Sequence, residues 1–130
     1  MKKQIYICIS FLLLLSCGEV QEEKSENLQI VCTTGMLGDA VENMVGELAV
    51  VNTLMGPGVD PHLYKATQGD IKVLVAADVI IHNGLHLEGK MGEVFKKLSN
   101  KKRIIVAAEG VEPSDLINNT DFVGAQDPHL

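Results

Sequence analysis

The sequence predicts an α/β fold in which a four-stranded parallel sheet is flanked by helices. Short apolar segments rich in β-branched residues alternate along the chain with segments whose apolar residues recur at helical spacing. Strands are predicted at residues 28–33, 48–55, 78–82 and 103–107. Because a helical segment separates each strand from the next, the strands are expected to run parallel in a sheet covered on both faces. About 100 residues suffice for one such domain.

The first unit joins a buried strand to an amphipathic helix. Thr34 follows the strand and is a suitable N-cap, because its hydroxyl can accept a hydrogen bond from the first helical turn. Gly46 is expected to end the helix. The predicted core-facing stripe consists of Met36, Leu37, Ala40, Val41, Met44 and Val45.

The second strand leads into a stiff loop that presents a histidine. Residues 56–61 contain two glycines and two prolines, which is typical of a loop. Pro61 fixes its own φ and pushes Asp60 toward an extended conformation. His62 therefore lies on a stiff backbone at the carboxyl end of a strand, where open α/β sheets bind ligands. Neutral imidazole is a common metal ligand, although most loop histidines are merely solvated.

The remaining elements continue the alternation. Thr67 and Asp70 have the spacing of a capping box at the start of a helix over residues 68–77, with Asp in place of the usual Glu or Gln. Another helix is predicted after the strand at 78–82, and residues 110–126 form a polar surface connection. The apolar face of this helix is predicted to consist of Leu87, Met91, Val94, Phe95 and Leu98.

The tetrapeptide Asp-Pro-His-Leu at residues 60–63 recurs at residues 127–130. Two histidines on stiffened backbone, far apart in the sequence, are candidates for two ligands of one metal ion. We therefore expect His62 and His129 to meet at the carboxyl edge of the sheet. The preceding aspartates either accept a proton from the imidazole or cap a turn, and both interpretations stay open.

A second pair of histidines does not fit a metal site. His82 and His86 are four residues apart, as in a helical ligand pair, but Gly84 lies between them and His82 ends a predicted strand. We interpret this spacing as accidental. Cys32 lies inside an apolar strand and is expected to be a buried packing residue.

The N-terminus has the features of a lipoprotein signal. Residues 1–16 combine two lysines with an apolar run too short to span a bilayer as a helix, and the run stops at Cys17. Cys17 is the predicted site of lipidation, against the alternative of an ordinary signal peptide with an incidental cysteine. Residues 17–27 are polar and charged, which predicts a flexible tether ahead of a domain over residues 28–130.

Charge excludes one class of partner. Removal of residues 1–16 takes away two lysines and no acid, which leaves nine Lys and Arg against 17 Asp and Glu, a net charge of about −8. Such a charge argues against a nucleic-acid partner and suits a cation.

Three segments resemble those of a known family. The stretch Gly-Pro-Gly-Val-Asp-Pro-His-Leu-Tyr at 56–64, Asn-Gly-Leu-His-Leu-Glu at 83–88 and Asp-Pro-His at 127–129 resemble the metal-binding lipoproteins of bacterial ABC importers for zinc and manganese. These are the cluster A-I solute-binding proteins, and the resemblance runs from about residue 28 to residue 130. It implies that this region is the N-terminal lobe of a two-lobed protein. The second lobe would supply a third ligand, His or Glu, and a final Asp.

The resemblance also implies a function. It implies a non-enzymatic receptor, anchored by lipid in the cell envelope and facing the periplasm or the exterior, that delivers Zn²⁺ or Mn²⁺ to a membrane permease. Residues 107–126 contain no His, which slightly favours a mixed zinc and manganese type over a zinc-dedicated one. A surface adhesin of the same family is an alternative. A metallohydrolase ranks far lower, because no His-Glu-x-x-His or comparable acid–base cluster occurs.

Overall fold

The computed structural model describes residues 27–117 and 126–129. Cys17, the predicted signal and nearly all of the predicted tether lie outside the described residues, so these three expectations stay predictions. The elements are β1 (Leu28–Thr34), α2 (Gly35–Val45), η1 (Gly46–Leu48), β2 (Ala49–Met55), α3 (Gln68–Ala76), β3 (Val79–His82), α4 (Gly92–Leu98), β4 (Arg103–Val106) and η2 (Ala107–Gly110).

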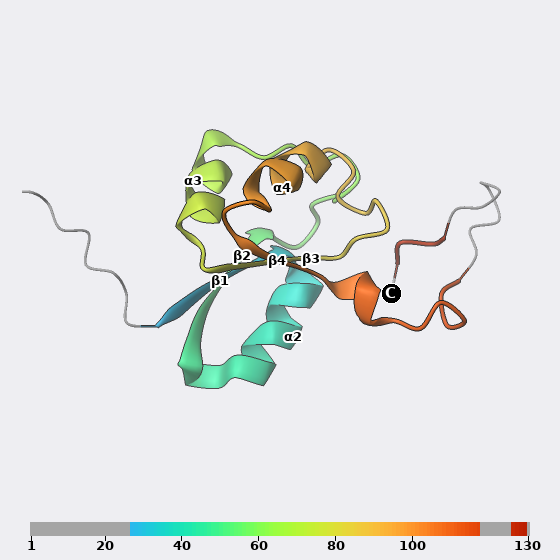
Figure 1. The fold of residues 1–130 in the computed structure, drawn as a ribbon, viewed down its shortest axis with the longest axis horizontal. Coiled ribbons are helices and arrows are strands. Elements are labelled where there is room, and N and C mark those ends of the chain that lie inside the picture. Colours follow the sequence, from blue (N-terminus) through green and yellow to red (C-terminus); the bar gives the residue numbers. More distant parts are fainter. Residues whose placement is uncertain (1–26, 118–125, 130) are drawn as a thin grey trace, which may run out of the picture.

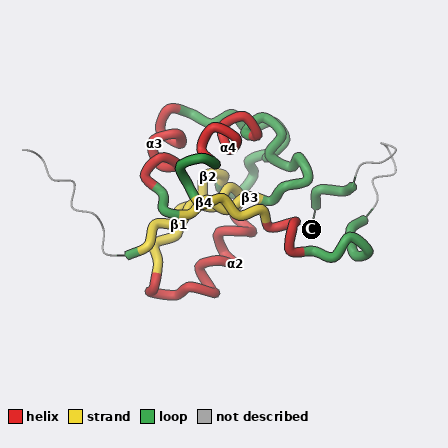
Figure 2. The backbone as a smooth tube through the Cα atoms, viewed as in Figure 1, coloured by secondary structure: helices red, strands yellow, loops and turns green. Residues whose placement is uncertain are grey.

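The described strands form one sheet with the order β2-β1-β3-β4, and every neighbouring pair is parallel. Helix α2 lies on one face of the sheet, and α3 and α4 lie on the other (Figure 1). The tube view shows the same layers, with the loops that follow β2 and β3 on the side of α3 and α4 (Figure 2). The predicted fold class is confirmed, and the strand bounds differ from those predicted by no more than one residue.

Local signals set the helix ends as expected. The hydroxyl of Thr34 accepts a hydrogen bond from the backbone N–H of Leu37, and Gly46 ends α2 with φ of 53°, a left-handed value that suits glycine. The capping box at the start of α3 is present in both directions between Thr67 and Asp70. Among the described helices, none is both long and apolar enough to cross a membrane.

The core lies between the sheet and the helices α3 and α4. Its members are apolar side chains that are almost fully buried, namely Val31, Met55, Leu74, Ala77, Ile80, Met91 and Phe95. Cys32 is buried in β1, as predicted, and burial followed by the charge of Glu42 raises the pKa of its thiol to about 11. An inert, protonated thiol is the consequence.

Two expectations about helices were wrong. Met36 and Met44, predicted to be core residues, are 69% and 83% exposed. Helix α2 instead faces the sheet through the strip that contains Gly38, whose lack of a side chain allows close contact with Thr53 of β2. This close approach turns the flank with the two methionines away from the strands.

The third predicted helix begins later than expected. We placed Leu87 on its face, but α4 begins at Gly92. Leu85 and His86 have φ values of 49° and 64°, outside the right-handed helical region, so the chain first makes a series of turns. Leu87 and Met91 are nevertheless buried, as the apolar pattern required.

Candidate metal centre

The two Asp-Pro-His segments meet at the carboxyl edge of the sheet. The centroids of the His62 and His129 rings lie 5.5 Å apart, with an angle of 67° between the ring planes. His62 lies in the loop that follows β2, and His129 lies after β4. The prediction that the two histidines share one edge is confirmed, whereas their role as metal ligands stays a prediction.

Asp60 shapes the loop that carries His62. Its Oδ1 accepts a hydrogen bond of 2.9 Å from the backbone N–H of His62, and its carbonyl accepts one of 3.3 Å from Leu63. This is the turn-capping arrangement that the sequence left open as one of two alternatives.

Tyr64 joins the same loop to the helix that follows it. Its hydroxyl donates to Oδ2 of Asp70 at 2.7 Å, and that carboxylate also takes part in the capping box of α3. Burial, followed by the hydrogen bond and the charge of Asp70, raises the pKa of Tyr64 to about 12. The loop of His62 is thus fixed to α3 by side-chain contacts.

Asp127 contacts both the backbone and the ring of His129, whereas within the described part of the chain Asp60 contacts only the backbone of His62. Oδ1 of Asp127 accepts a 2.9 Å hydrogen bond from the backbone N–H of His129 and also lies 2.7 Å from Nδ1 of the imidazole. These contacts, the backbone one first, lower the pKa of Asp127 below its ordinary value. A carboxylate on Nδ1 selects the tautomer whose Nε2 is free to bind a metal. Asp127 therefore both caps the turn and accepts a proton from the imidazole, the two alternatives that the sequence left open.

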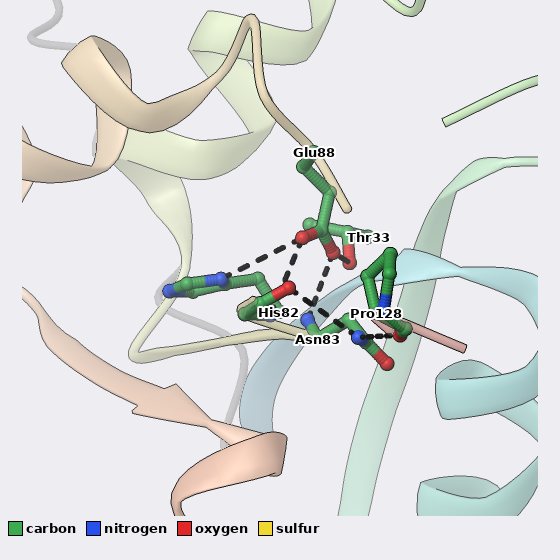
Figure 3. Close-up of polar contacts among 6 residues, drawn as sticks. Thr33, His82, Asn83, Glu88 and Pro128 are labelled. Atoms are coloured by element: carbon green, nitrogen blue, oxygen red, sulfur yellow. Dashed lines mark hydrogen bonds and ion pairs between the residues drawn. The ribbon is translucent and has the colours of Figure 1, made fainter. Parts of the chain in front are cut away.

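A buried carboxylate lies next to this site, and sequence reasoning missed it. Glu88 is only 4% exposed. Its Oε1 accepts hydrogen bonds from the Thr33 hydroxyl at 2.5 Å and from the backbone N–H of Asn83 at 2.8 Å, and its Oε2 accepts one from Gly84 at 3.4 Å (Figure 3). Nδ1 of His82 lies 3.8 Å from Oε2. Burial alone would raise the pKa of Glu88, but His82, Thr33 and the backbone N–H groups outweigh burial and lower the pKa to about 2.

Asn83 connects this carboxylate to the second histidine segment. Its side-chain Nδ2 donates to the carbonyl of Pro128 at 2.8 Å (Figure 3). Its own carbonyl accepts a hydrogen bond of 2.9 Å from the N–H of Ala108. The contact with Pro128 joins residues 45 positions apart in the chain. These contacts give the segment that begins at Asn83 a structural role.

An open hollow of about 320 Å³ lies between His129 and the loop that leads to His62. His129 and Asn83 contribute polar side chains to its wall. Most of the remaining wall is apolar and comes from Met36, Met55, Pro57, Val59, Pro61 and Leu87. An apolar wall lowers the local access of water and so strengthens electrostatic interactions at its rim.

His82 and His86 do not form a helical pair. His82 ends β3 and stacks on Phe95, with ring centroids 4.4 Å apart and planes at 13°. His86 lies in the left-handed turn and lines a separate hollow of about 270 Å³. Within residues 27–117 and 126–129, no group of three or more His, Cys, Asp or Glu side chains is arranged to bind a metal ion.

Comparison with known proteins agrees with this architecture. The profile of the family described as "Zinc-uptake complex component A periplasmic" (ZnuA) matches residues 30–130. The manganese-binding lipoprotein MntA of Bacillus subtilis is 48% identical over 106 residues, which are 80% of this chain and 35% of MntA. The zinc-binding protein TroA of Treponema pallidum is 46% identical over 103 residues, which are 78% of this chain and 32% of TroA.

Solved structures match the fold as well. The structure of the periplasmic zinc-binding protein TroA from Treponema pallidum superimposes with a TM-score of 0.74 at 45% identity, over 79% of this chain and 36% of that one. The Mn-bound periplasmic metal-binding protein from Candidatus Liberibacter asiaticus gives a TM-score of 0.68 at 30% identity, over 79% and 38% of the two chains. The chain spans about a third of the length of these relatives.

Proposed function

Because the chain belongs to the family of periplasmic zinc-uptake component A proteins, we propose that it captures Zn²⁺ or Mn²⁺ outside the cytoplasm and delivers the ion to the permease of an ABC importer. It acts as a binding protein and not as an enzyme. The observation that carries the proposal is the contact between the His62 and His129 rings, which come from two copies of one tripeptide.

The separation of the rings suits a shared ion. A metal bound to an imidazole nitrogen at about 2 Å lies roughly 3 Å from the ring centre, and a tetrahedral angle between two such ligands puts the ring centres about 5 Å apart. The observed 5.5 Å is close to that separation. His62 and His129 are therefore the two proposed metal ligands.

The rest of the coordination shell is assigned to residues outside the described part of the chain. Binding sites for transition cations close with four or more ligands, and the described residues contribute two imidazoles. We assign residues 28–130 to the N-terminal lobe and the remaining ligands, a His or Glu and an Asp, to a second lobe. The relatives are long enough to contain one, since the matched region is about a third of their length.

The choice between the two cations rests on those remaining ligands. Imidazole nitrogen suits Zn²⁺, whereas Mn²⁺ prefers carboxylate oxygen. The named relatives include a manganese-binding and a zinc-binding protein at nearly equal identity. We therefore propose the class of cargo, Zn²⁺ or Mn²⁺, and not one metal. No contact within the described residues favours the adhesin or the metallohydrolase.

Calorimetric titration of Zn²⁺ and Mn²⁺ tests the ligand assignment. The 130-residue chain is expected to bind weakly, and a longer protein with a second lobe is expected to bind tightly. In both, His62→Ala should sharply lower affinity without unfolding the domain, because a loop side chain contributes little to the core. Tight stoichiometric binding by the 130-residue chain that persists in His62→Ala would contradict the proposal.

The membrane anchor is a separate part of the proposal. We assign lipidation to Cys17, whose diacyl modification would tie the domain to a membrane through residues 17–27. Mass spectrometry of the protein extracted from its own membrane should find an acylated Cys17 as the first residue. An unmodified N-terminus, or a Cys17→Ala protein that stays equally membrane-bound, would remove this assignment.

A further inference from the structure

We propose that Asn83 and Glu88 are positioning residues that set the place of the His129 imidazole beside His62. This inference rests on the proposed function, since it takes His129 as a metal ligand. It gives the Glu88 carboxylate and the Asn83 amide a role in positioning the ligand, although neither group contacts the ion.

The peptide that joins Pro128 to His129 is fixed from both sides. Its carbonyl accepts a hydrogen bond of 2.8 Å from Nδ2 of Asn83, and its N–H donates to Oδ1 of Asp127 at 2.9 Å. Because a peptide unit is planar, these two bonds define the orientation of the plane from which the His129 side chain departs. The contact between Asp127 and Nδ1 of the ring then sets the direction of the imidazole.

Of these partners, Asn83 connects the peptide to the sheet. Asp127 belongs to the same short segment as His129, and its N–H donates to the carbonyl of Ile117 at 2.7 Å, beyond the last strand. Asn83 directly follows β3 and is 6% exposed. The position of Asn83 relative to the sheet therefore determines the position of His129. Asp127 cannot do this, because it moves together with His129.

Glu88 in turn fixes Asn83. Its Oε1 accepts from the backbone N–H of Asn83 and from the hydroxyl of Thr33 in β1, so one oxygen joins β1 to the residue that follows the adjacent strand β3 (Figure 3). The left-handed turn at Leu85 and His86 returns the chain so that Glu88 reaches back to Asn83. The path runs from Glu88 through Asn83 to the Pro128 carbonyl, which is one peptide away from the proposed ligand.

Such partners tune metal affinity. Residues that orient a ligand without touching the metal usually contribute about 10–100-fold in affinity. In Asn83→Asp the donor that faces the Pro128 carbonyl becomes a carboxylate that repels it. In Glu88→Gln the neutral amide places an N–H₂ group against the N–H of Gly84. We expect Asn83→Asp to have the larger effect on His129, because it acts one step closer.

Nuclear magnetic resonance of the metal-free chain tests the inference without reference to metal. The wild-type chain should show a nuclear Overhauser contact between the two imidazoles, and another from the Asn83 side-chain amide to the backbone N–H of His129. Asn83→Asp and Glu88→Gln should lose the contact between the rings. A matched control is Lys102→Met, which removes a side-chain hydrogen bond to the Ala77 carbonyl at the opposite edge of the sheet and should keep the ring contact.

Three results would overturn the positioning role. One is a ring contact that persists in both folded variants, and another is its loss in the control. The third is the absence of the contact between the Asn83 amide and His129 in the wild-type chain, which decides the matter even if both variants fail to fold.

Titration of Mn²⁺ alone into the same samples separates this inference from the proposed function. Paramagnetic broadening should reach both rings in the wild-type chain and require about 10–100-fold more Mn²⁺ in Asn83→Asp. If Mn²⁺ broadens neither ring and Zn²⁺ shifts the resonances of neither ring, but Asn83→Asp still separates the rings, the proposed function fails and the positioning role stands. If Mn²⁺ broadens both rings equally in wild type and variant, the function stands and the positioning role is wrong.

Discussion

The two Asp-Pro-His segments share a sequence but not a set of contacts. At residues 60–62, Oδ1 of the aspartate accepts from the backbone N–H of the histidine, and among the described residues no hydrogen bond joins Asp60 to the imidazole of His62. At residues 127–129, the equivalent oxygen binds both the backbone and the ring. The tripeptide thus specifies the backbone turn, while the surroundings decide how the ring is oriented.

The supports of the two segments differ in the same way. The first lies between β2 and α3 and is fixed through Tyr64 to the helix that follows. The second lies after β4, and its link to the sheet runs through Asn83 and Glu88, residues that belong to a different loop. Local sequence therefore supports His62, and distant sequence supports His129.

The largest expected effect is a loss of stability in acid, because Glu88 belongs to the support of the second segment only. The pKa of Glu88 is about 2 in the folded chain against an ordinary 4.5, so its contribution to stability is fully present above pH 4.5 and is lost as the pH falls toward 2. For a carboxylate this buried, the contribution is on the order of 3 kcal/mol. Urea unfolding of wild type and Glu88→Gln across this window should show a steeper loss of stability in wild type. Parallel curves would mean that Glu88 is not charged in the folded chain.

Removal of the charge from each aspartate should sharpen the comparison. Asp127→Asn replaces the carboxylate on Nδ1 of His129 and should weaken Zn²⁺ binding by about tenfold, at the lower end of the range for such partners. Asp60→Asn should change affinity little, because Asn caps a turn about as well as Asp. The two variants are matched, since each replaces one carboxylate oxygen by an amide nitrogen at the first position of an Asp-Pro-His segment. Equal effects in a Zn²⁺ titration would mean that the contact with Nδ1 does not matter.

The smallest expected effect concerns the first segment alone. Tyr64→Phe removes the hydroxyl that donates to Asp70 and should lower the free energy of unfolding by about 1 kcal/mol, the usual size of one hydrogen bond. The resonances of the loop around His62 should shift, while those of residues 126–129 should not. Thermal unfolding with a residue-by-residue spectrum checks both parts. Equal shifts in the two segments would show that they share a support.

The accuracy of the sequence predictions follows the same division between local and distant contacts. The strands, the cap at Thr34 and the capping box at Thr67 are set by residues within a few positions, and all are present. The repeat of Asp-Pro-His correctly indicated that two remote histidines meet, because the carboxyl ends of parallel strands lie at one edge.

The features that the sequence did not reveal depend on contacts across the fold. Glu88 is buried because Thr33, 55 positions away, supplies a hydroxyl, and no local pattern encodes that partner. Met36 has the spacing of a core residue but is exposed, because close contact at Gly38 sets the rotation of α2 on the sheet. The apolar neighbour Leu87 is by itself only a weak indication that the charged Glu88 is buried.

The central claim is that His62 and His129 bind one ion together. A double-mutant cycle in Zn²⁺ affinity, measured by chemical-shift titration of wild type, His62→Ala, His129→Ala and the double variant, tests it most directly. If the ion is shared, either single variant should remove most of the affinity, and the double variant should be little worse than the weaker single one. Losses that simply add, or a single variant that binds as wild type does, would contradict a shared site.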